Sequence, residues 1–253
     1  NSAVPLMNRA ISNFAPGSTF KLAAAIAGAK YGLDDMSCNC PGYTMYGSIK
    51  IRCHKHVGHG TLSLLKAIQL SCNPYFMKIC NSIGYKRMVE VYTMLGLGQQ
   101  SGIRLPLENA GIVPGSARWK ERNKGQKMTP AFTGMMGIGQ GFCQATPLQM
   151  AVIVSTIANG GKHYKPRIVN KVHNTLTGKT TSDNTKPLDL KLEGIKAEYL
   201  EHIREGMKLA ADSGTARRAK PKDIDIGGKT GTAQTTDKGV KTHVAWTAAF
   251  APY

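Results

Sequence analysis

The segment APGSTFKLAAAIAG, residues 15–28, places a Pro-Gly pair, a serine and a lysine directly before an apolar run. Pro-Gly favours a turn and residues 22–26 favour a buried helix, so the segment predicts the start of a helix. Ser18 and Lys21 are three positions apart and would share one helix face, where an amine can reach a hydroxyl. A helix N-terminus also favours negative charge that develops at Ser18. The segment alone therefore allows two interpretations, a simple helix start or a nucleophile with its own base.

The composition is that of an ordinary folded protein with a basic surface. The 253 residues can bury a sizeable core, as one large domain or two smaller subdomains. The net charge of +18 suits an anionic neighbour or a solvated basic surface. The chain lacks zinc-finger spacing with a following histidine pair, RNP-type aromatic motifs and long basic runs, which argues against nucleic acid as a partner.

The two ends of the sequence carry no recognisable targeting segment. No apolar run reaches the length of a membrane span, and residues 1–10 lack the layout of a signal peptide. Because the sequence begins and stops without a capping element, we interpret it as an excised fragment whose missing signals say nothing about location.

Hydrophobic periodicity divides the chain into a mainly helical part, about residues 18–160, and a sheet-bearing part, about residues 161–253. Helices are predicted at residues 18–31, 61–84 (two helices broken near Asn73-Pro74), 85–98, 146–161 and 196–211. Loops are predicted at residues 34–60 (a Cys/His-rich insert), 99–127 and 175–186. A strand is predicted at residues 165–174, and a β-hairpin joins 225–236 to 242–252 through a turn at 237–239. This order predicts an α+β domain in which an antiparallel sheet carries a helical subdomain.

Three polar motifs follow one another along the chain: STFK at 18–21, SCN at 71–73 and KTGT at 229–232. Ser71 and Asn73 lie at a helix break, where a chain reversal can aim two side chains at one place, although they could also cap the second helix. Lys229 lies on a predicted strand after two glycines that allow close approach, although it could also protect an edge strand. The order S-x-x-K, S-x-N, K-T-G is that of penicillin-binding proteins and class A β-lactamases.

The chain resembles the transpeptidase domain of class B penicillin-binding proteins, and most closely their elongation type. The segments that carry the resemblance are PLMNRAISNFAPGSTFK, GHGTLSLLKAIQLSCNPYF, GIGQG at 137–141, ATPLQMA, GGKTGTAQ and AAFAPY. The resemblance covers almost all of the chain and is weakest at 99–128 and 171–195. It implies the penicillin-binding transpeptidase and serine β-lactamase-like fold, truncated at both ends, with the family's membrane anchor and pedestal absent. It also implies a location at the outer face of the bacterial cytoplasmic membrane.

The resemblance assigns the first two motifs to bond making and proton transfer. Ser18 would attack the penultimate D-alanine carbonyl of a peptidoglycan stem peptide, and β-lactams would acylate the same serine. Neutral Lys21 would take its proton, which requires a lowered pKa. Ser71 would relay a proton to the leaving D-alanine, while Asn73 holds Lys21 and the substrate amide.

The third motif is assigned to substrate binding. Lys229 would supply positive potential, and the hydroxyls of Thr230 and Thr232, on either side of Gly231, would bind the terminal carboxylate. The backbone N–H groups of Ser18 and Thr232 would form the oxyanion hole. The implied partners are stem peptides, β-lactams and the cell-elongation machinery, including a glycosyltransferase, with no organic cofactor and no nucleic acid.

Two other functions keep the same motifs. A serine β-lactamase would use water in place of an acceptor amine, but the chain shows no additional carboxylate in a recognisable deacylation motif. A penicillin-binding sensor or scaffold module would be acylated without turnover, and the motifs alone do not separate it from a transpeptidase.

The cysteines suggest a metal as well as a disulfide. One 35-residue window holds Cys38, Cys40, Cys53, Cys72, His54, His56 and His59. An oxidising exterior would favour disulfides, and the thiols could also be buried and free. The surrounding loop, however, has too little apolar content to order itself, and tetrahedral Cys₃His zinc sites contribute folding energy directly.

In the elongation-type relatives the segments that match this window carry metal ligands. The resemblance therefore implies a structural zinc ion on Cys40, Cys53, His59 and Cys72, with Cys38 as the substitute for Cys40 and His54 or His56 as less favoured ligands. Cys80 and Cys143 lie in apolar contexts and are predicted to be core thiols. Because Cys72 lies between Ser71 and Asn73, such a metal would fix the backbone that aims both side chains.

Overall fold

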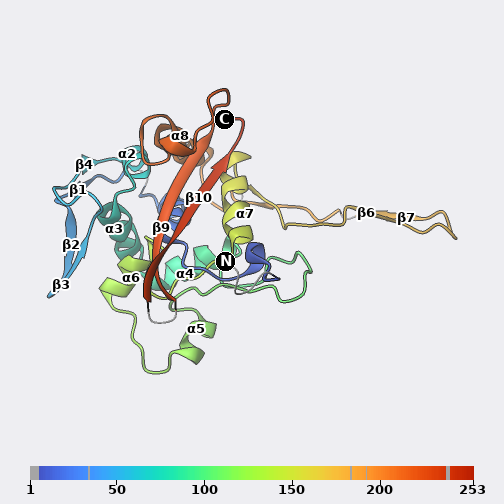
Figure 1. Ribbon diagram of the computed structural model, residues 1–253, viewed down its shortest axis with the longest axis horizontal. Coiled ribbons are helices and arrows are strands. Elements are labelled where there is room, and N and C mark those ends of the chain that lie inside the picture. The colour runs from blue at the N-terminus through green and yellow to red at the C-terminus, as the bar shows by residue number, and fades with distance from the viewer. Residues whose placement is uncertain (1–5, 34, 183, 192, 238–239) are drawn as a thin grey trace.

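The elements of the fold are seen in a computed structural model that describes residues 6–33, 35–182, 184–191, 193–237 and 240–253 (Figure 1). The helices are α1 (Lys21–Lys30), α2 (Leu64–Gln69), α3 (Asn73–Ile83), α4 (Tyr85–Met94), α5 (Ala117–Arg122), α6 (Pro130–Met136), α7 (Pro147–Ala158) and α8 (Ala197–Ser213), with 3-10 turns at Arg9–Ile11, Gly17–Phe20 and Arg217–Ala219. The strands are β1 (Cys38–Cys40), β2 (Tyr43–Tyr46), β3 (Ile49–Arg52), β4 (Gly60–Leu62), β5 (Lys162–His163), β6 (Lys171–His173), β7 (Thr180–Ser182), β8 (Leu188–Asp189), β9 (Gly227–Asp237) and β10 (Val240–Phe250). In the described part of the chain they form five antiparallel pairs: β1–β4, β2–β3, β5–β8, β6–β7 and β9–β10. The α+β class is confirmed.

Helix α1 is the centre of the core. Residues 22–29 are all buried because Leu, Ile, Ala and Gly make the helix apolar on every side. It packs against α3, α4 and α8, and Gly28 leaves room for Ile79 of α3, which would lie 3.4 Å from an added Cβ. Lys21, the first residue of α1, is therefore held beneath the surface.

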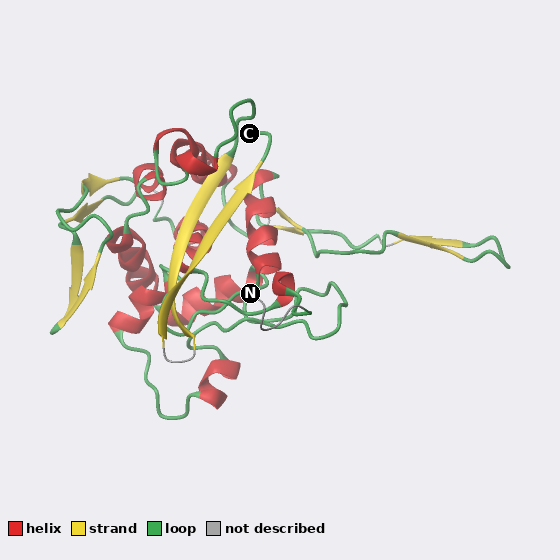
Figure 2. Ribbon diagram, in the orientation of Figure 1, coloured by secondary structure: helices red, strands yellow, loops and turns green. Residues whose placement is uncertain are grey.

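The β9–β10 hairpin lies across the helices, with α8 against β9 and α7 against β10 (Figures 1 and 2). Its register pairs Gly227 with Phe250 and Asp237 with Val240, so the predicted hairpin is confirmed. Residues 238 and 239 of the predicted turn lie outside the described residues. None of the described helices is long and apolar enough to cross a bilayer.

The insert at 34–60 contains more regular structure than predicted. Strands β1 to β3 lie inside it and β4 begins at its last residue. Each strand has only three or four residues, which is too short to produce a detectable hydrophobic alternation. The insert folds back tightly on itself, since a Cβ on Gly42 would lie 1.9 Å from the His56 carbonyl oxygen.

The predicted helix break near Asn73-Pro74 is confirmed. It lies at residues 70–72, and Asn73-Pro74 begins α3 because proline is tolerated in the first turn of a helix. Other predictions were wrong for local reasons. Helix α5 interrupts the predicted loop 99–127, and α6 was not predicted. Both helices are short and depend on caps, which Ser116 and Thr129 provide by accepting backbone N–H bonds.

An extended arm, described at residues 165–182 and 184–187, projects away from the body of the molecule (Figure 1). Only residues 171–173 of the predicted strand 165–174 are in a strand, and they pair with β7 inside the predicted loop 175–186. The arm is exposed along its length, so no buried face imposes a long regular pairing.

Candidate active site

The turn that carries Ser18 is wedged against β9. Gly17 has φ +54°, and its N–H donates to the Gly139 carbonyl at 3.0 Å. A Cβ on Gly17 would lie 2.8 Å from the Thr232 carbonyl oxygen, and a Cβ on Gly231 would lie 3.1 Å from the Ser18 backbone nitrogen. The two glycines therefore allow the backbone of β9 to approach the Ser18 turn.

Lys21 connects the first motif to the second. Its side chain is fully buried, and its Nζ lies 2.7 Å from Ser71 O, 3.1 Å from Ser71 Oγ and 2.7 Å from Asn73 Oδ1. Among the described residues the Ser18 hydroxyl has no hydrogen-bond partner, so Lys21 does not donate to it here. Catalytic hydrogen bonds often tighten only when substrate is bound. Ser71 and Asn73 of the second motif thus orient the Lys21 amine.

Ser71 has a strained backbone at the chain reversal between α2 and α3. Its φ is +52°, a region that residues other than glycine rarely adopt. The N–H groups of Ser71 and Cys72 donate to Ile68 O at 3.2 Å and Ala67 O at 3.0 Å, which holds the reversal in place. Strain of this kind is concentrated at functional sites. It aims the Ser71 hydroxyl and the Asn73 amide at the same amine.

Lys229 reaches the same hydroxyl from β9. Its Nζ lies 2.8 Å from Ser71 Oγ and 2.9 Å from Thr230 O, and its side chain is fully buried. Ser71 Oγ therefore lies between two amines, Lys21 and Lys229. A hydroxyl can donate its one proton to a neutral amine while it accepts from a charged one. The arrangement is suited to passing a proton through Ser71.

Burial makes both amines easier to deprotonate. Burial lowers the pKa of Lys21 to about 8, although the charge interactions with the nearby sulfurs of Cys53, Cys72 and Cys40 oppose this change. The pKa of Lys229 falls well below its ordinary value, first because of burial and second because of the charge on Lys21. One of the two can thus be neutral near physiological pH, as a general base requires.

A cleft of about 770 Å³ opens above these groups. It is lined by Ser18, Ser71, Asn73, Thr230, Gly231 and Thr232, so the residues of all three motifs meet there. Thr232 is exposed in the cleft, while the Thr230 hydroxyl donates to Thr215 O at 3.2 Å. Both hydroxyls therefore lie at the cleft, and the Thr230 hydroxyl is hydrogen-bonded within the chain.

Four other residues of the cleft were not predicted from sequence: Thr215, Lys50, Arg52 and His243. Thr215 follows Gly214, where α8 ends, and its N–H donates to Gln69 O at 3.2 Å. A glycine after a helix signals only a helix end. These residues reach the cleft through contacts between distant segments, which leave no local pattern.

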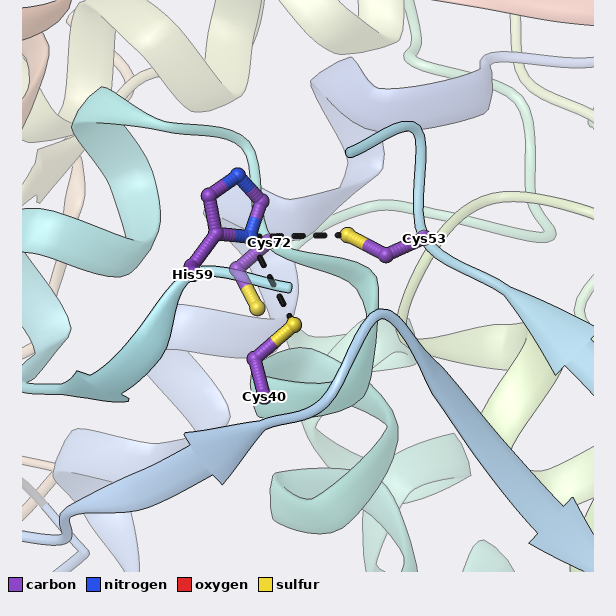
Figure 3. A group of neighbouring side chains, drawn as sticks. All are labelled: Cys40, Cys53, His59 and Cys72. Carbon is purple, nitrogen blue, oxygen red and sulfur yellow. Dashed lines mark hydrogen bonds between the residues drawn. The ribbon is translucent and has the colours of Figure 1, made fainter. Parts of the chain in front are cut away.

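Beside the cleft, Cys40, Cys53, His59 and Cys72 form one cluster whose ligand atoms all lie within 4.8 Å of one another (Figure 3). His59 Nδ1 lies 3.5 Å from Cys40 Sγ and 3.7 Å from Cys53 Sγ. Zn–S bonds of ~2.3 Å and Zn–N bonds of ~2.05 Å at tetrahedral angles require an S···N separation of about 3.6 Å. The two separations from His59 Nδ1 thus match those of a tetrahedral Cys₃His site.

Two thiols of the cluster, Cys53 and Cys72, interact directly. A hydrogen bond between the Cys53 and Cys72 sulfurs lowers the pKa of Cys53 and raises that of Cys72. The Asn73 backbone N–H also donates to Cys53 Sγ at 3.4 Å. Deprotonated sulfur is the form that binds metal. Burial lowers the pKa of His59, which favours the neutral ring that metals require.

Of the other candidate ligands, His54 contacts this cluster at Cys53. Cys38 Sγ instead contacts the Asn39 carbonyl at 3.5 Å, and burial raises the pKa of its thiol. His54 Nδ1 lies 3.9 Å from Cys53 Sγ, and His56 lines the cleft. Cys80 and Cys143 are buried in the core.

Comparisons with known proteins agree with this geometry. Residues 1–253 match the family described as penicillin binding protein transpeptidase domain. The chain is 35% identical over 235 residues to "Peptidoglycan D,D-transpeptidase MrdA" of Acinetobacter baumannii. The aligned region covers 91% of this chain and 34% of that protein. It therefore spans about a third of the length of this curated relative.

Two solved structures have the same fold at 30% sequence identity. The Pseudomonas aeruginosa PBP2 crystal structure, in complex with WCK 5153, superposes with a TM-score of 0.83 and covers 98% of this chain and 56% of that chain. A complex between PBP2 and MreC from Helicobacter pylori gives a TM-score of 0.81 and covers 98% of this chain and 45% of that chain.

Proposed function

The chain belongs to the penicillin-binding protein transpeptidase family, and from this premise we propose that it is the catalytic part of a peptidoglycan D,D-transpeptidase of the elongation type. It would cross-link stem peptides through an acyl-enzyme on Ser18, which β-lactams would also form. The observation that carries the proposal is the buried path Lys21–Ser71–Lys229 under an exposed cleft that ends at Ser18.

The acylation step follows from this path. Ser18 Oγ forms a bond to the carbonyl carbon of the penultimate D-alanine, and its proton passes to neutral Lys21. Negative charge develops on the carbonyl oxygen, where the Ser18 and Thr232 N–H groups would donate; their close approach depends on Gly17 and Gly231. The C–N bond then breaks, and Ser71 delivers a proton to the departing D-alanine nitrogen.

The second step uses the same groups in reverse. An amine from a neighbouring stem peptide enters the cleft and attacks the ester carbonyl, while a proton passes from that amine to Lys21. The new amide forms as the bond to Ser18 Oγ breaks, and the proton returns to Ser18. The hydroxyls of Thr230 and Thr232 would hold the terminal carboxylate of the donor before acylation, and Lys229 would supply positive potential beneath them.

We also propose a structural zinc ion on Cys40, Cys53, His59 and Cys72. Its support is the tetrahedral spacing of the ligand atoms and the lowered pKa of Cys53. When bound, zinc would supply folding energy and hold the Cys72 backbone, with no part in bond breaking. Ser71 and Asn73 would keep their aim because both are adjacent to Cys72.

The setting of the reaction is part of the same proposal. The substrate chemistry places the domain at the outer face of the bacterial cytoplasmic membrane, within the cell-elongation machinery and beside a glycosyltransferase. The solved complex of a similar PBP2 with MreC supports a partner of this kind.

The test is acylation and transfer in the full-length protein. A fluorescent penicillin should label one peptide, which mass mapping assigns to Ser18, and Ser18→Ala should abolish labelling. The matched control Ser63→Ala removes an exposed hydroxyl that caps nothing and should label normally. Cross-linked product from a pentapeptide donor and an amine acceptor supports the transpeptidase. Rapid penicillin hydrolysis would indicate a β-lactamase, and acylation without transfer would indicate a sensor.

A further inference from the structure

One wall of the cleft is basic. Lys50 and Arg52, at the end of β3, line the cleft together with His54 and His56 of the following segment. Among the described residues that line the cleft, none is Asp or Glu. A cleft lined by charge of one sign concentrates its field and attracts ions of the opposite sign. This wall is thus suited to an anionic group of whatever occupies the cleft.

The wall is anchored to the catalytic residues. The Asn73 amide nitrogen donates to the Arg52 carbonyl at 3.0 Å, and the Asn73 backbone N–H donates to Cys53 Sγ at 3.4 Å. The Cys53 N–H in turn donates to Gly42 O at 2.8 Å, which joins the end of β3 to the rest of the insert. The Arg52 side chain therefore starts from a fixed backbone beside the asparagine that holds Lys21.

Lys50 and Arg52 face the same side of the β2–β3 pair. They are two residues apart in β3, opposite Met45 and Tyr43 of β2, so their side chains project together. Lys50 Nζ lies 4.1 Å from the centre of the Tyr43 ring, a cation–π contact that orders the chain without neutralising it. The other face contacts α3, where the Asn81 amide donates to Tyr46 Oη at 2.8 Å.

Neither charge is neutralised by the described part of the chain. The ion pairs there lie in the β5–β8 pair, in helix α8 and in the loop that follows α8. Lys50 and Arg52 form none of them. Both side chains are exposed, so they are available to a ligand.

We propose that Lys50 and Arg52 form a subsite for a carboxylate of the stem peptide upstream of its D-Ala-D-Ala end. The inference rests on the proposed function, in which the terminal carboxylate is already held by the third motif. The wall would therefore face a different anionic group of the same peptide. Stem peptides offer two sources of one chemistry: the α-carboxylate of a γ-linked D-glutamate, and the side-chain carboxylate of a diaminopimelic acid at position three.

The experiment compares peptide pairs that differ by one carboxylate. One pair has D-glutamate or D-isoglutamine at position two, and the other has diaminopimelic acid or lysine at position three. Each pentapeptide competes with a fluorescent penicillin for the full-length protein, and the readout is the ratio of affinities within a pair. This ratio cancels any general effect of a substitution on the cleft.

We expect the unmodified protein to prefer the carboxylated member of one pair by about two- to fivefold, the size of an exposed charge pair. The Lys50→Gln/Arg52→Gln variant should lose the preference, and Lys50→Arg/Arg52→Lys should keep it. The preference should also weaken in high salt. The control Lys171→Gln/Lys179→Gln removes the same charge from the exposed arm and should change nothing.

Each outcome decides one question. The pair that shows the preference identifies which carboxylate is bound. A ratio near one for both pairs, or a preference that survives Lys50→Gln/Arg52→Gln, would overturn the subsite. If penicillin does not acylate Ser18, the proposed function is wrong, and calorimetric titration with the same peptide pairs still measures the affinity ratio.

Discussion

Gly17→Ala tests whether close approach of the Ser18 turn to β9 builds the oxyanion hole. The substitution places a methyl group 2.8 Å from the Thr232 carbonyl, so the two backbones must separate by about 0.6 Å to reach 3.4 Å. An oxyanion donor works at ~2.7–3.1 Å, and loss of one such donor costs about 10²-fold in rate. We therefore expect the penicillin acylation rate to fall by about 10²-fold. The positive φ of Gly17 adds strain of about 1 kcal/mol, and the clash adds ~1–3 kcal/mol.

Gly32→Ala is the matched control. Gly32 has φ +68° but nothing within 4 Å of an added Cβ, so it carries the strain without the clash. The melting temperature of the Gly32→Ala variant should fall by about 2–4 °C, and its acylation rate should not change. The melting temperature of the Gly17→Ala variant should fall two to four times as far. Equal acylation rates for the two variants would refute the argument that the Gly17–Thr232 approach positions the oxyanion donors.

Three further predictions concern the metal, the base and the relay. Elemental analysis of protein purified without chelator should find about one zinc per chain. The Cys40→Ser variant should lose this zinc, and the Cys38→Ser variant should keep it. A Cys40–Cys53 disulfide would contradict the proposed zinc site. The acylation rate should rise with pH through an apparent pKa near 8, because burial lowers the pKa of Lys21 to about 8 and only the neutral amine is a base. A flat profile would contradict this assignment. Between about pH 8 and 10.5 the Lys21 amine binds fewer protons in the folded protein than in the unfolded chain, so the contribution of Lys21 to stability should rise with pH in that interval. Ser71→Ala should slow acylation by about 10²- to 10⁴-fold, and a rate within tenfold of the unmodified protein would exclude the relay.

Long periodic helices and strands can be predicted well from the sequence, and short ones poorly. The helix at 146–161 carries a threonine cap, a proline and paired glycines, and α7 has the complete capping box between Thr146 and Gln149. The β9–β10 hairpin has eleven paired positions and was equally clear. Strands β1 to β4 and helices α5 and α6 are held by caps, glycines and neighbouring segments, so local periodicity does not show them.

The candidate site shows the same division. The resemblance of the three motifs to those of a known family predicts which side chains meet. It does not predict the left-handed backbone of Ser71 or the shared position of its hydroxyl between Lys21 and Lys229. Those features arise where α1, the α2–α3 reversal and β9 pack together. A pattern read along one segment contains no information about that packing.

The position of the insert explains why a metal would matter to catalysis without touching substrate. The Asn73 side chain accepts from Lys21 Nζ through Oδ1 and donates to Arg52 O through its amide nitrogen, so one side chain joins the base to the insert. The Asn73 backbone is held separately by Cys53 Sγ. Little of the insert is buried, since its β2–β3 pair is half-buried or exposed throughout, and an isolated two-stranded pair is marginally stable in water. A weakly ordered insert would let Asn73 rotate, and Lys21 would then lose the acceptor that fixes its orientation. An ion that cross-links Cys40, Cys53, His59 and Cys72, as proposed above, would remove that freedom. The requirement for order at Asn73 thus accounts for a ligand cluster beside the cleft.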